Sequence, residues 1–332
     1  MRPRRVLAGV VSLLAAVSVV AAPQAAAAAQ CVYNRVDLPL PAGVTSAQTE
    51  GSSTNNSRIV GSYRAPNISR AVYWVNSTLR ELPPATSPFY DVFPEAVNNT
   101  SVVVGRQEWR YDLRTASQAF RYENGAYQFL ETAQDENSTA YGVNDAGDVV
   151  GTVWKKTTPA ERTVVMWPRN GARKSFGLGH PVGINTQRKI AAYDDQAETS
   201  VIINADTGAR IEIGGRPPMV LDNDRVLNYE YFGQMVDGQI SEWDLSGVRV
   251  ADHARGWWAY GKNNSGTVFG NLEHTLGGGP TLWRPNSRGP VVADKLPSNY
   301  YYGDVTDAAT LIGSWKDDAQ NPHPARWLWL CS

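Results

Sequence analysis

The sequence predicts an all-β fold, a seven-bladed β-propeller that closes by pairing its N-terminal strand with its C-terminal blade. Three observations predict this architecture. A unit of four short strands recurs about every 42 residues. Residues typical of tight turns separate the strands. The last unit lacks its fourth strand, and a matching strand stands near the start of the chain. Stacked blades cover the apolar faces that one blade leaves open, whereas a β-sandwich gives no reason for this period.

The first two strands of each unit flank a polar turn. The residues that open these turns are Asn55, Asn98, Asn144, Asn185, Asp222, Asn263 and Thr306. The second strand carries an aliphatic run, and a short residue follows six or seven positions after the turn opens. These short residues are Gly61, Gly105, Gly151, Ala192, Asn228, Gly270 and Gly313.

The third strand begins about 20 residues after the turn opens and usually carries an aromatic residue. These aromatics are Trp74, Tyr122, Trp167, Trp243, Trp283 and Trp329. A residue that recurs once per blade is expected to pack between blades rather than to bind a ligand. Asn-Gly and Ser-Gly pairs then predict a hairpin into a shorter fourth strand, because these residues tolerate positive φ.

The missing strand predicts how the ring closes. The seventh unit ends with "PARWLWLCS", whereas "CVYNRVDLPLP" at the other end resembles the fourth strands "TLRELPP" and "VVADKLP". The N-terminal strand is therefore expected to complete the last blade. Cys31 and Cys331 would then lie side by side, and two cysteines in a secreted chain favour one disulfide.

Residues 1–29 are expected to be a secretory signal peptide. Three arginines precede an apolar run, and an alanine-rich tail leads to a cleavage site after Ala29. A single membrane anchor is the alternative, but the apolar core is short. Residues 30–332 then form one extracellular propeller domain. No later stretch is apolar enough to span a membrane. Without the three arginines the net charge is about −4, which disfavours a nucleic-acid partner.

Several segments resemble a known repeat family. "GVNDAGDVVG", "KNNSGTVFG" and "QAFRYENG" resemble the HAF-type extracellular repeats of secreted bacterial proteins, and the resemblance extends from about residue 47 to 330. Gln118 stands where the second motif of that family opens with His. The resemblance implies a secreted, propeller-like protein, and it brings no catalytic residues to this chain.

The loops between second and third strands, and the crossings between blades, vary in length and content. Both are expected on one face of the ring, called the top face below, where function is most often placed. All four histidines, His180, His253, His274 and His323, are assigned to this face. Their spacing matches no metal site, and no catalytic or cofactor motif is present, so no catalytic residue, metal or cofactor is predicted.

Aromatic residues in the crossings directly before the innermost strands of units 6 and 7 mark the predicted ligand site. It comprises Trp257, Trp258, Tyr300, Tyr301 and Tyr302, with His253, Arg255 and Asp304 beside them. Flat rings next to charges suit a sugar or an extended peptide. The alternative is that these rings only cover the blade tops.

The sequence therefore favours a secreted, monomeric, non-catalytic protein that binds a carbohydrate or peptide on the top face. Two alternatives stay open. One is a carbohydrate-active enzyme, either a polysaccharide lyase or a glycoside hydrolase. The other is a structural or adhesion propeller without a small ligand.

Overall fold

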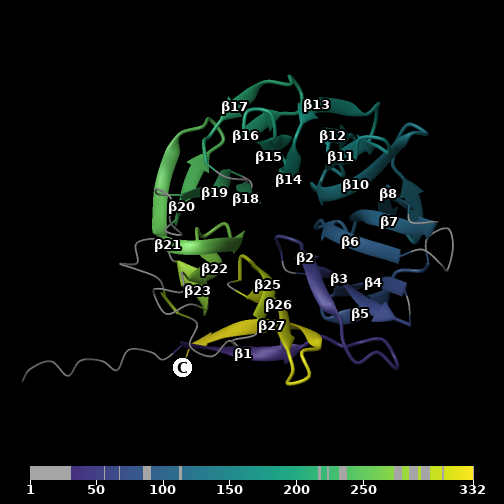
Figure 1. Cartoon of the computed structure of the whole chain (residues 1–332). Coiled ribbons are helices and arrows are strands. Elements are labelled where there is room, and N and C mark those ends of the chain that lie inside the picture. Colours follow the sequence, from purple (N-terminus) through teal and green to yellow (C-terminus); the bar gives the residue numbers. More distant parts are fainter. Residues whose placement is uncertain are drawn as a thin grey trace, which may run out of the picture.

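The computed structural model describes residues 31–331 with short gaps. The gaps are residues 56, 67, 85–90, 112–113, 216–217, 223, 232–237, 273–278, 284–290, 293–299 and 309, and the side chains of some strand residues are also left undescribed. Within the described part every regular element is a β-strand, and the strands form seven blades around a central axis (Figure 1). The predicted fold class is confirmed. In the same ranges no helix has the length and apolarity needed to cross a bilayer.

Each of the first four blades is a sheet of four antiparallel strands in chain order. Blade 1 contains β2 (Gln48–Ser52), β3 (Arg58–Ala65), β4 (Ile68–Val75) and β5 (Thr78–Glu81). Blade 2 contains β6 (Asp91–Val97), β7 (Val103–Tyr111), β8 (Arg114–Glu123) and β9 (Ala126–Phe129). Blade 3 contains β10 (Glu136–Val143), β11 (Val149–Lys155), β12 (Thr163–Trp167) and β13 (Lys174–Leu178). Blade 4 contains β14 (His180–Ile184), β15 (Lys189–Asp194), β16 (Thr199–Asn204) and β17 (Arg210–Glu212).

Blades 5 and 6 share one long strand. Blade 5 contains β18 (Pro218–Leu221), β19 (Arg225–Tyr231), β20 (Gly238–Asp244) and the first half of β21 (Arg249–Lys262). Blade 6 contains the second half of β21, β22 (Val268–Leu272), β23 (Gly279–Trp283) and β24 (Val291–Val292). The chain thus crosses between these blades without leaving the extended conformation.

The last blade is completed from the other end of the chain. Its order is β25 (Tyr300–Val305), β26 (Leu311–Lys316), β27 (Pro322–Cys331) and β1 (Cys31–Asp37). β1 pairs with β27 along its whole length, which confirms the predicted closure. The register places the Cα atoms of Cys31 and Cys331 opposite each other. The disulfide itself stays a prediction, because the side chains of both residues lie outside the described part.

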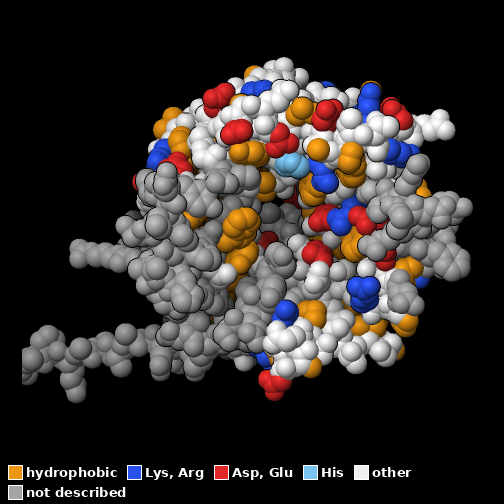
Figure 2. Space-filling view, in the orientation of Figure 1, with side chains coloured by type: hydrophobic (Ala, Val, Ile, Leu, Met, Phe, Trp, Pro, Cys, Tyr) orange, Lys and Arg blue, Asp and Glu red, His pale blue; other side chains and the backbone are white. Residues whose placement is uncertain are grey.

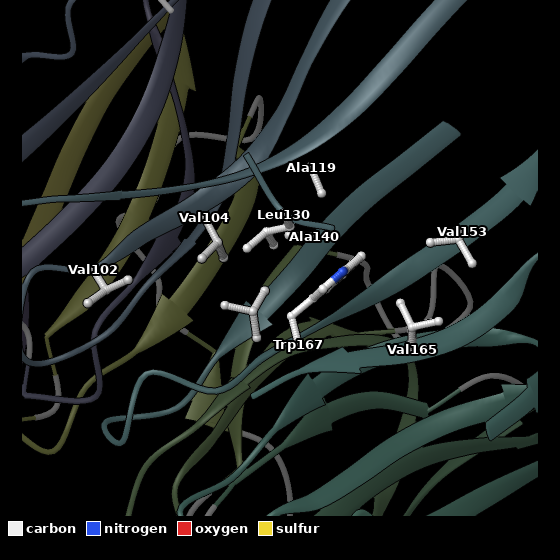
Figure 3. Packing of buried hydrophobic residues seen from close by; sticks show 9 residues of the cluster. Val102, Val104, Ala119, Leu130, Ala140, Val153, Val165 and Trp167 are labelled. Carbon is white, nitrogen blue, oxygen red and sulfur yellow. The ribbon is translucent and has the colours of Figure 1, made fainter. Parts of the chain in front are cut away.

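Buried tryptophans fill the space between blades. The ring of Trp167 lies among residues of blades 2 and 3 (Figure 3), and its Nε1 donates to the carbonyl of Glu131 at 2.8 Å. A Cβ atom on Gly151 would lie 2.8 Å from this ring, so the short residue of the second strand makes room for it. The packing role predicted for the repeated aromatics is confirmed here.

The corresponding tryptophan of the last blade differs from the prediction. Trp327, opposite Leu311, takes the position that Trp167 has opposite Val149. Trp327 is fully buried. The assignment of Trp329 to this position was therefore wrong by one pair of residues, because the register is set by the pairing of Gly313 with Ala325.

The asparagines that open the repeated turns connect neighbouring blades. The Oδ1 atom of Asn144 accepts from the backbone N–H of Asp148, which closes its own turn. Its Nδ2 atom donates to the carbonyl of Asn185 in the next blade at 3.0 Å. Asn98 donates to the carbonyl of Asn144, and Asn263 to that of Thr306, in the same way. All four asparagine side chains are buried.

One predicted turn residue is wrong. In blade 1 the N–H that closes the turn belongs to Ser53, which donates to the carbonyl of Arg58, whereas Asn55 lies inside the turn. The cause is a turn one residue longer than that of Asn98, whose N–H donates to the carbonyl of Val102.

Candidate functional site

Cavities follow the central axis of the ring. Three adjoining cavities of about 230 to 240 Å³ each are lined by residues of the innermost strands of all seven blades. Figure 2 shows the hollow at the centre of the ring, with acidic and basic side chains meeting at its rim beside β6. The central channel is therefore the concave surface to which the whole ring contributes.

Every innermost strand carries a β-bulge at this channel. The residues that the bulges leave without a partner are Glu50, Glu95, Tyr141, Val182, Met219, Tyr260 and Tyr302. A bulge redirects a side chain away from the regular alternation of a strand. Glu50, Tyr141, Val182 and Tyr260 all line the channel cavities. Four of the seven blades thus present the side chain of a bulge residue to the channel in the described part.

Two of these bulge residues are carboxylic acids from adjacent blades. Glu95 forms an ion pair with Arg106, whose Nε lies 2.6 Å from a carboxylate oxygen of Glu108. Glu50 accepts hydrogen bonds from Gln48 at 2.5 Å and from Ser62 at 2.9 Å. Polar neighbours therefore fix both carboxyl groups in place.

Burial changes how these two groups titrate. The pKa of Glu95 is raised to about 7, first because burial removes hydration and then because the charge of Glu50 lies nearby, whereas Arg106 acts to lower it. Burial also raises the pKa of Glu50, against its two hydrogen bonds. A carboxyl group that is protonated near neutral pH can donate a proton or a hydrogen bond to a bound molecule.

A third carboxyl group, that of Asp304, lines two of the three channel cavities. The hydroxyl of Ser52 donates to Asp304 at 2.6 Å, and the backbone N–H of Val305 donates at 2.8 Å. Burial nevertheless raises the pKa of Asp304 to about 6, with Asp222 and Asp307 adding repulsion. No cation pairs with Asp304 among the described contacts, so its charged form is poorly stabilised.

Part of the predicted ligand site lies at this channel. Trp258 and Asp304 line one cavity together with Glu50 and Tyr260. Trp258 is 53% exposed, the largest exposed aromatic among the described residues. The predicted position of the aromatics needs correction: Trp257 and Trp258 belong to β21 itself, and Tyr300–Tyr302 to β25, rather than to crossings before these strands.

Other predicted site residues are separate or undescribed. The side chains of Trp257, Arg255 and Tyr300–Tyr302 lie outside the described part. His253 lies on the blade 5 half of β21, where its Nε2 is 3.0 Å from a carboxylate oxygen of Glu242. It is not among the residues that line the channel cavities.

The described histidines each contact a different carboxylate. His180 lies 3.2 Å from Asp195, and His323 lies 3.1 Å from Asp317 and stacks on Trp315. His274 lies outside the described residues. Within the described part no group of three or more His, Cys, Asp or Glu side chains is placed to hold a metal ion.

Sequence reasoning missed Glu50 and Glu95. Both stand three residues before the first residue of the turn between the first two strands, which is Ser53 in blade 1 and Asn98 in blade 2. At the same position blades 3 and 6 carry Tyr141 and Tyr260. A charged residue at a repeated strand position was the available signal. Comparison of this strand position among the seven units would have identified both residues.

Comparisons with known proteins bear on the fold. No family model and no curated protein matches the sequence. Among solved structures, oligogalacturonate lyase from Vibrio parahaemolyticus superposes with a TM-score of 0.58 at 9% identity, over 91% of this chain and 98% of that one. An oligogalacturonate lyase in complex with manganese gives 0.54 at 10% identity, with the same shares of the two chains.

A third similar structure is named for a different protein. U3-55K superposes with a TM-score of 0.54 at 10% identity, over 89% of this chain and 98% of that one. The shared feature is the propeller. At identities of 9 to 10% these similarities show the fold alone, because one propeller scaffold supports unrelated functions.

Proposed function

We propose that this protein is secreted and binds a carbohydrate at the mouth of its central channel. The observation that carries the proposal is Trp258, 53% exposed at a cavity that it shares with Glu50 and Asp304. An aromatic face supplies apolar contact to a sugar ring, while carboxyl oxygens accept hydrogen bonds from sugar hydroxyls. Tyr260 in the same cavity adds a second ring.

A glycan array with the Trp258→Ala variant tests this proposal. The variant should lose array binding while its free energy of unfolding stays within about 1 kcal/mol of the parent, as is usual for an exposed side chain. Val250→Ala is the matched control, since Val250 is also an exposed apolar residue of β21 but lies on its blade 5 half. Unchanged glycan binding by Trp258→Ala, or no binding by the parent protein, would contradict the proposal.

A second candidate is acid–base cleavage of the bound carbohydrate. The observation that favours it is the pKa of about 7 for Glu95, next to the second carboxyl group of Glu50. A group with this pKa can serve as a general acid near neutral pH. The fold also occurs in oligogalacturonate lyases, so a propeller of this size is compatible with carbohydrate chemistry.

Product analysis separates the two candidates. The parent protein is incubated with a panel of polysaccharides, with and without divalent metal ions, and the products are separated by chromatography. For the enzyme, Glu95→Gln should abolish product formation and retain binding. If the parent protein binds glycans and forms no product, the non-catalytic function stands.

A further inference from the structure

The largest described cavity lies away from the central channel. It has a volume of about 790 Å³ and lies between the ends of strands β7 and β11. Its walls come from blade 2, through Glu108, Trp109 and Ser117, and from blade 3, through Asn137, Trp154 and the segment 156–162. The volume falls in the range of sites that enclose small ligands.

Two tryptophans line the cavity from different blades. Trp109 belongs to β7 and Trp154 to β11, and neither follows the repeated aromatic position of the third strand. Packing between blades at that position is already provided by Trp167 in blade 3 and Tyr122 in blade 2. The two additional rings therefore give this cavity flat apolar walls, which suit sugar rings.

The charge of the cavity is positive. The guanidinium of Arg162 lies 4.7 Å over the ring of Trp154 and donates to the hydroxyl of Tyr141 at 3.2 Å. The ammonium of Lys156 donates to the carbonyl of Gln134 at 2.7 Å. Neither cation pairs with a carboxylate in the described ion pairs. The one acid in the lining, Glu108, is already paired with Arg106.

Cationic side chains next to aromatic rings favour a ligand that combines a ring with a negative charge. Guanidinium groups recognise carboxylates with directed hydrogen bonds, and an ammonium group adds a point charge. Asn137 and Ser117 supply polar groups to the same wall. Neutral sugars would leave both cations without a partner of opposite charge.

We propose that this cavity, lined by Trp109, Trp154, Lys156 and Arg162, is a second binding site that takes a saccharide carrying carboxylate groups. It is separate from the channel mouth and does not rest on the function proposed there. Tyr141 lines a channel cavity and contacts Arg162, so the two sites are neighbours in the fold.

Calorimetric titration with two matched probes tests this site. Trigalacturonate carries carboxylates, whereas a neutral galactose trisaccharide of the same linkage does not. The parent protein should bind trigalacturonate more tightly than the neutral probe, and its affinity for trigalacturonate should fall as salt is added. Arg162→Gln should weaken binding tenfold or more, and Lys156→Gln should weaken it less because Lys156 is exposed.

Two controls keep the result specific to the cavity. Lys155→Gln removes the same charge one residue away, from an exposed side chain that does not line the cavity, and should bind as the parent does. Trp258→Ala alters only the channel mouth, and in this background Arg162→Gln should weaken trigalacturonate binding as much as it does in the parent protein. Loss of binding in Trp258→Ala with retention in Arg162→Gln would transfer the acidic saccharide to the channel and overturn the proposal.

Other outcomes also contradict it. Equal binding of the neutral probe would show that the two cations do not select the ligand. Binding of an oligoglutamate peptide in place of trigalacturonate would assign the cavity to acidic peptides. Absence of binding by both probes and the peptide would leave the cavity without the proposed ligand class.

Discussion

At the scale of single residues, burial in the channel disfavours the charged form of a carboxyl group. Asp304 has two hydrogen bonds and no described cationic partner, and burial raises its pKa to about 6. The folded state therefore binds its proton more tightly than the unfolded chain does. The contribution of Asp304 to the free energy of unfolding is therefore fully present below the unfolded pKa of 3.8. It is lost as the pH rises through the folded pKa of about 6.

Replacement of Asp304 by Asn should remove this pH-dependent loss. An amide keeps an acceptor for the N–H of Val305 and carries no charge to bury. One pKa unit corresponds to about 1.4 kcal/mol, and partial exposure of the carboxyl reduces the full effect. We expect Asp304→Asn to be more stable than the parent by about 1–2 kcal/mol at pH 8 and by at most about 0.5 kcal/mol at pH 4, which lies just above the unfolded pKa of 3.8.

Urea denaturation at the two pH values measures the difference. Asp318→Asn, on an exposed turn, is the control and should match the parent at both. A gain in stability that is the same at pH 4 and pH 8 would show that charge burial is not its cause. If the Asp304 carboxyl group accepts hydrogen bonds from the bound carbohydrate, the stabilised variant should also bind carbohydrate less well. Stability and function often oppose each other in this way at functional sites.

At the scale of elements, the repeated asparagine is a connection between blades as well as a turn residue. Asn144 satisfies the N–H of Asp148 with its oxygen and the carbonyl of Asn185 with its nitrogen. A second, more exposed row follows the same path: Asn99 bonds to Asp145 through its backbone N–H at 2.9 Å and its Nδ2 at 2.8 Å. The short amide of Asn carries both the acceptor and the donor that the buried position uses.

Asn144→Ala should therefore destabilise the protein by about 2–4 kcal/mol. The change leaves the buried N–H of Asp148 without a partner, which costs about 1–3 kcal/mol. It also removes one of two hydrogen bonds to the carbonyl of Asn185, which still accepts from the N–H of Arg188. Asn99→Ala, in the exposed row, should cost less than about 1 kcal/mol. Chemical denaturation of both variants checks the contrast, and equal losses would show that the buried row has no special role.

These turns explain how much of the architecture could be predicted. Three features of the architecture depend on local sequence and were predicted: the repeat period, the short residues beside the tryptophans and the absence of a fourth strand in the last unit. Each agrees with the observed blades. The errors at Asn55 and Trp329 came from one-residue and two-residue differences in turn length and register, which repeat spacing does not resolve. The site was predicted only in part. Glu50 and Glu95 both stand at bulges, and Glu50 lines a channel cavity. A bulge depends on pairing between strands rather than on composition.

At the scale of the whole molecule, the ring depends on one seam between segments from opposite ends of the chain. β1 holds β27 by a full antiparallel ladder, and the N–H groups of Leu38 and Ala47 donate to the carbonyls of Pro324 and Pro322. Arg35 of β1 lies 3.9 Å over the ring of Trp315. Every other blade described here is formed from consecutive strands, so opening this seam is the change that converts the ring into an open array.

A disulfide between Cys31 and Cys331 is predicted at the end of this seam. The Cα atoms of the two residues are paired in the register, and the bond would close a loop of about 300 residues. For a loop of this length the chain-entropy model gives a stabilisation of about 5 kcal/mol, an upper-end figure because residual structure in the unfolded chain reduces it.

The double variant Cys31→Ser with Cys331→Ser should therefore unfold at a lower temperature and keep the parent circular dichroism spectrum. Peptide mapping of the secreted protein without reductant checks the bond directly, and recovery of both cysteines as free thiols would refute it. A reductant should lower the unfolding temperature of the parent to that of the double variant and leave the variant unchanged, because the bond acts on the unfolded chain rather than on the packing of the blades.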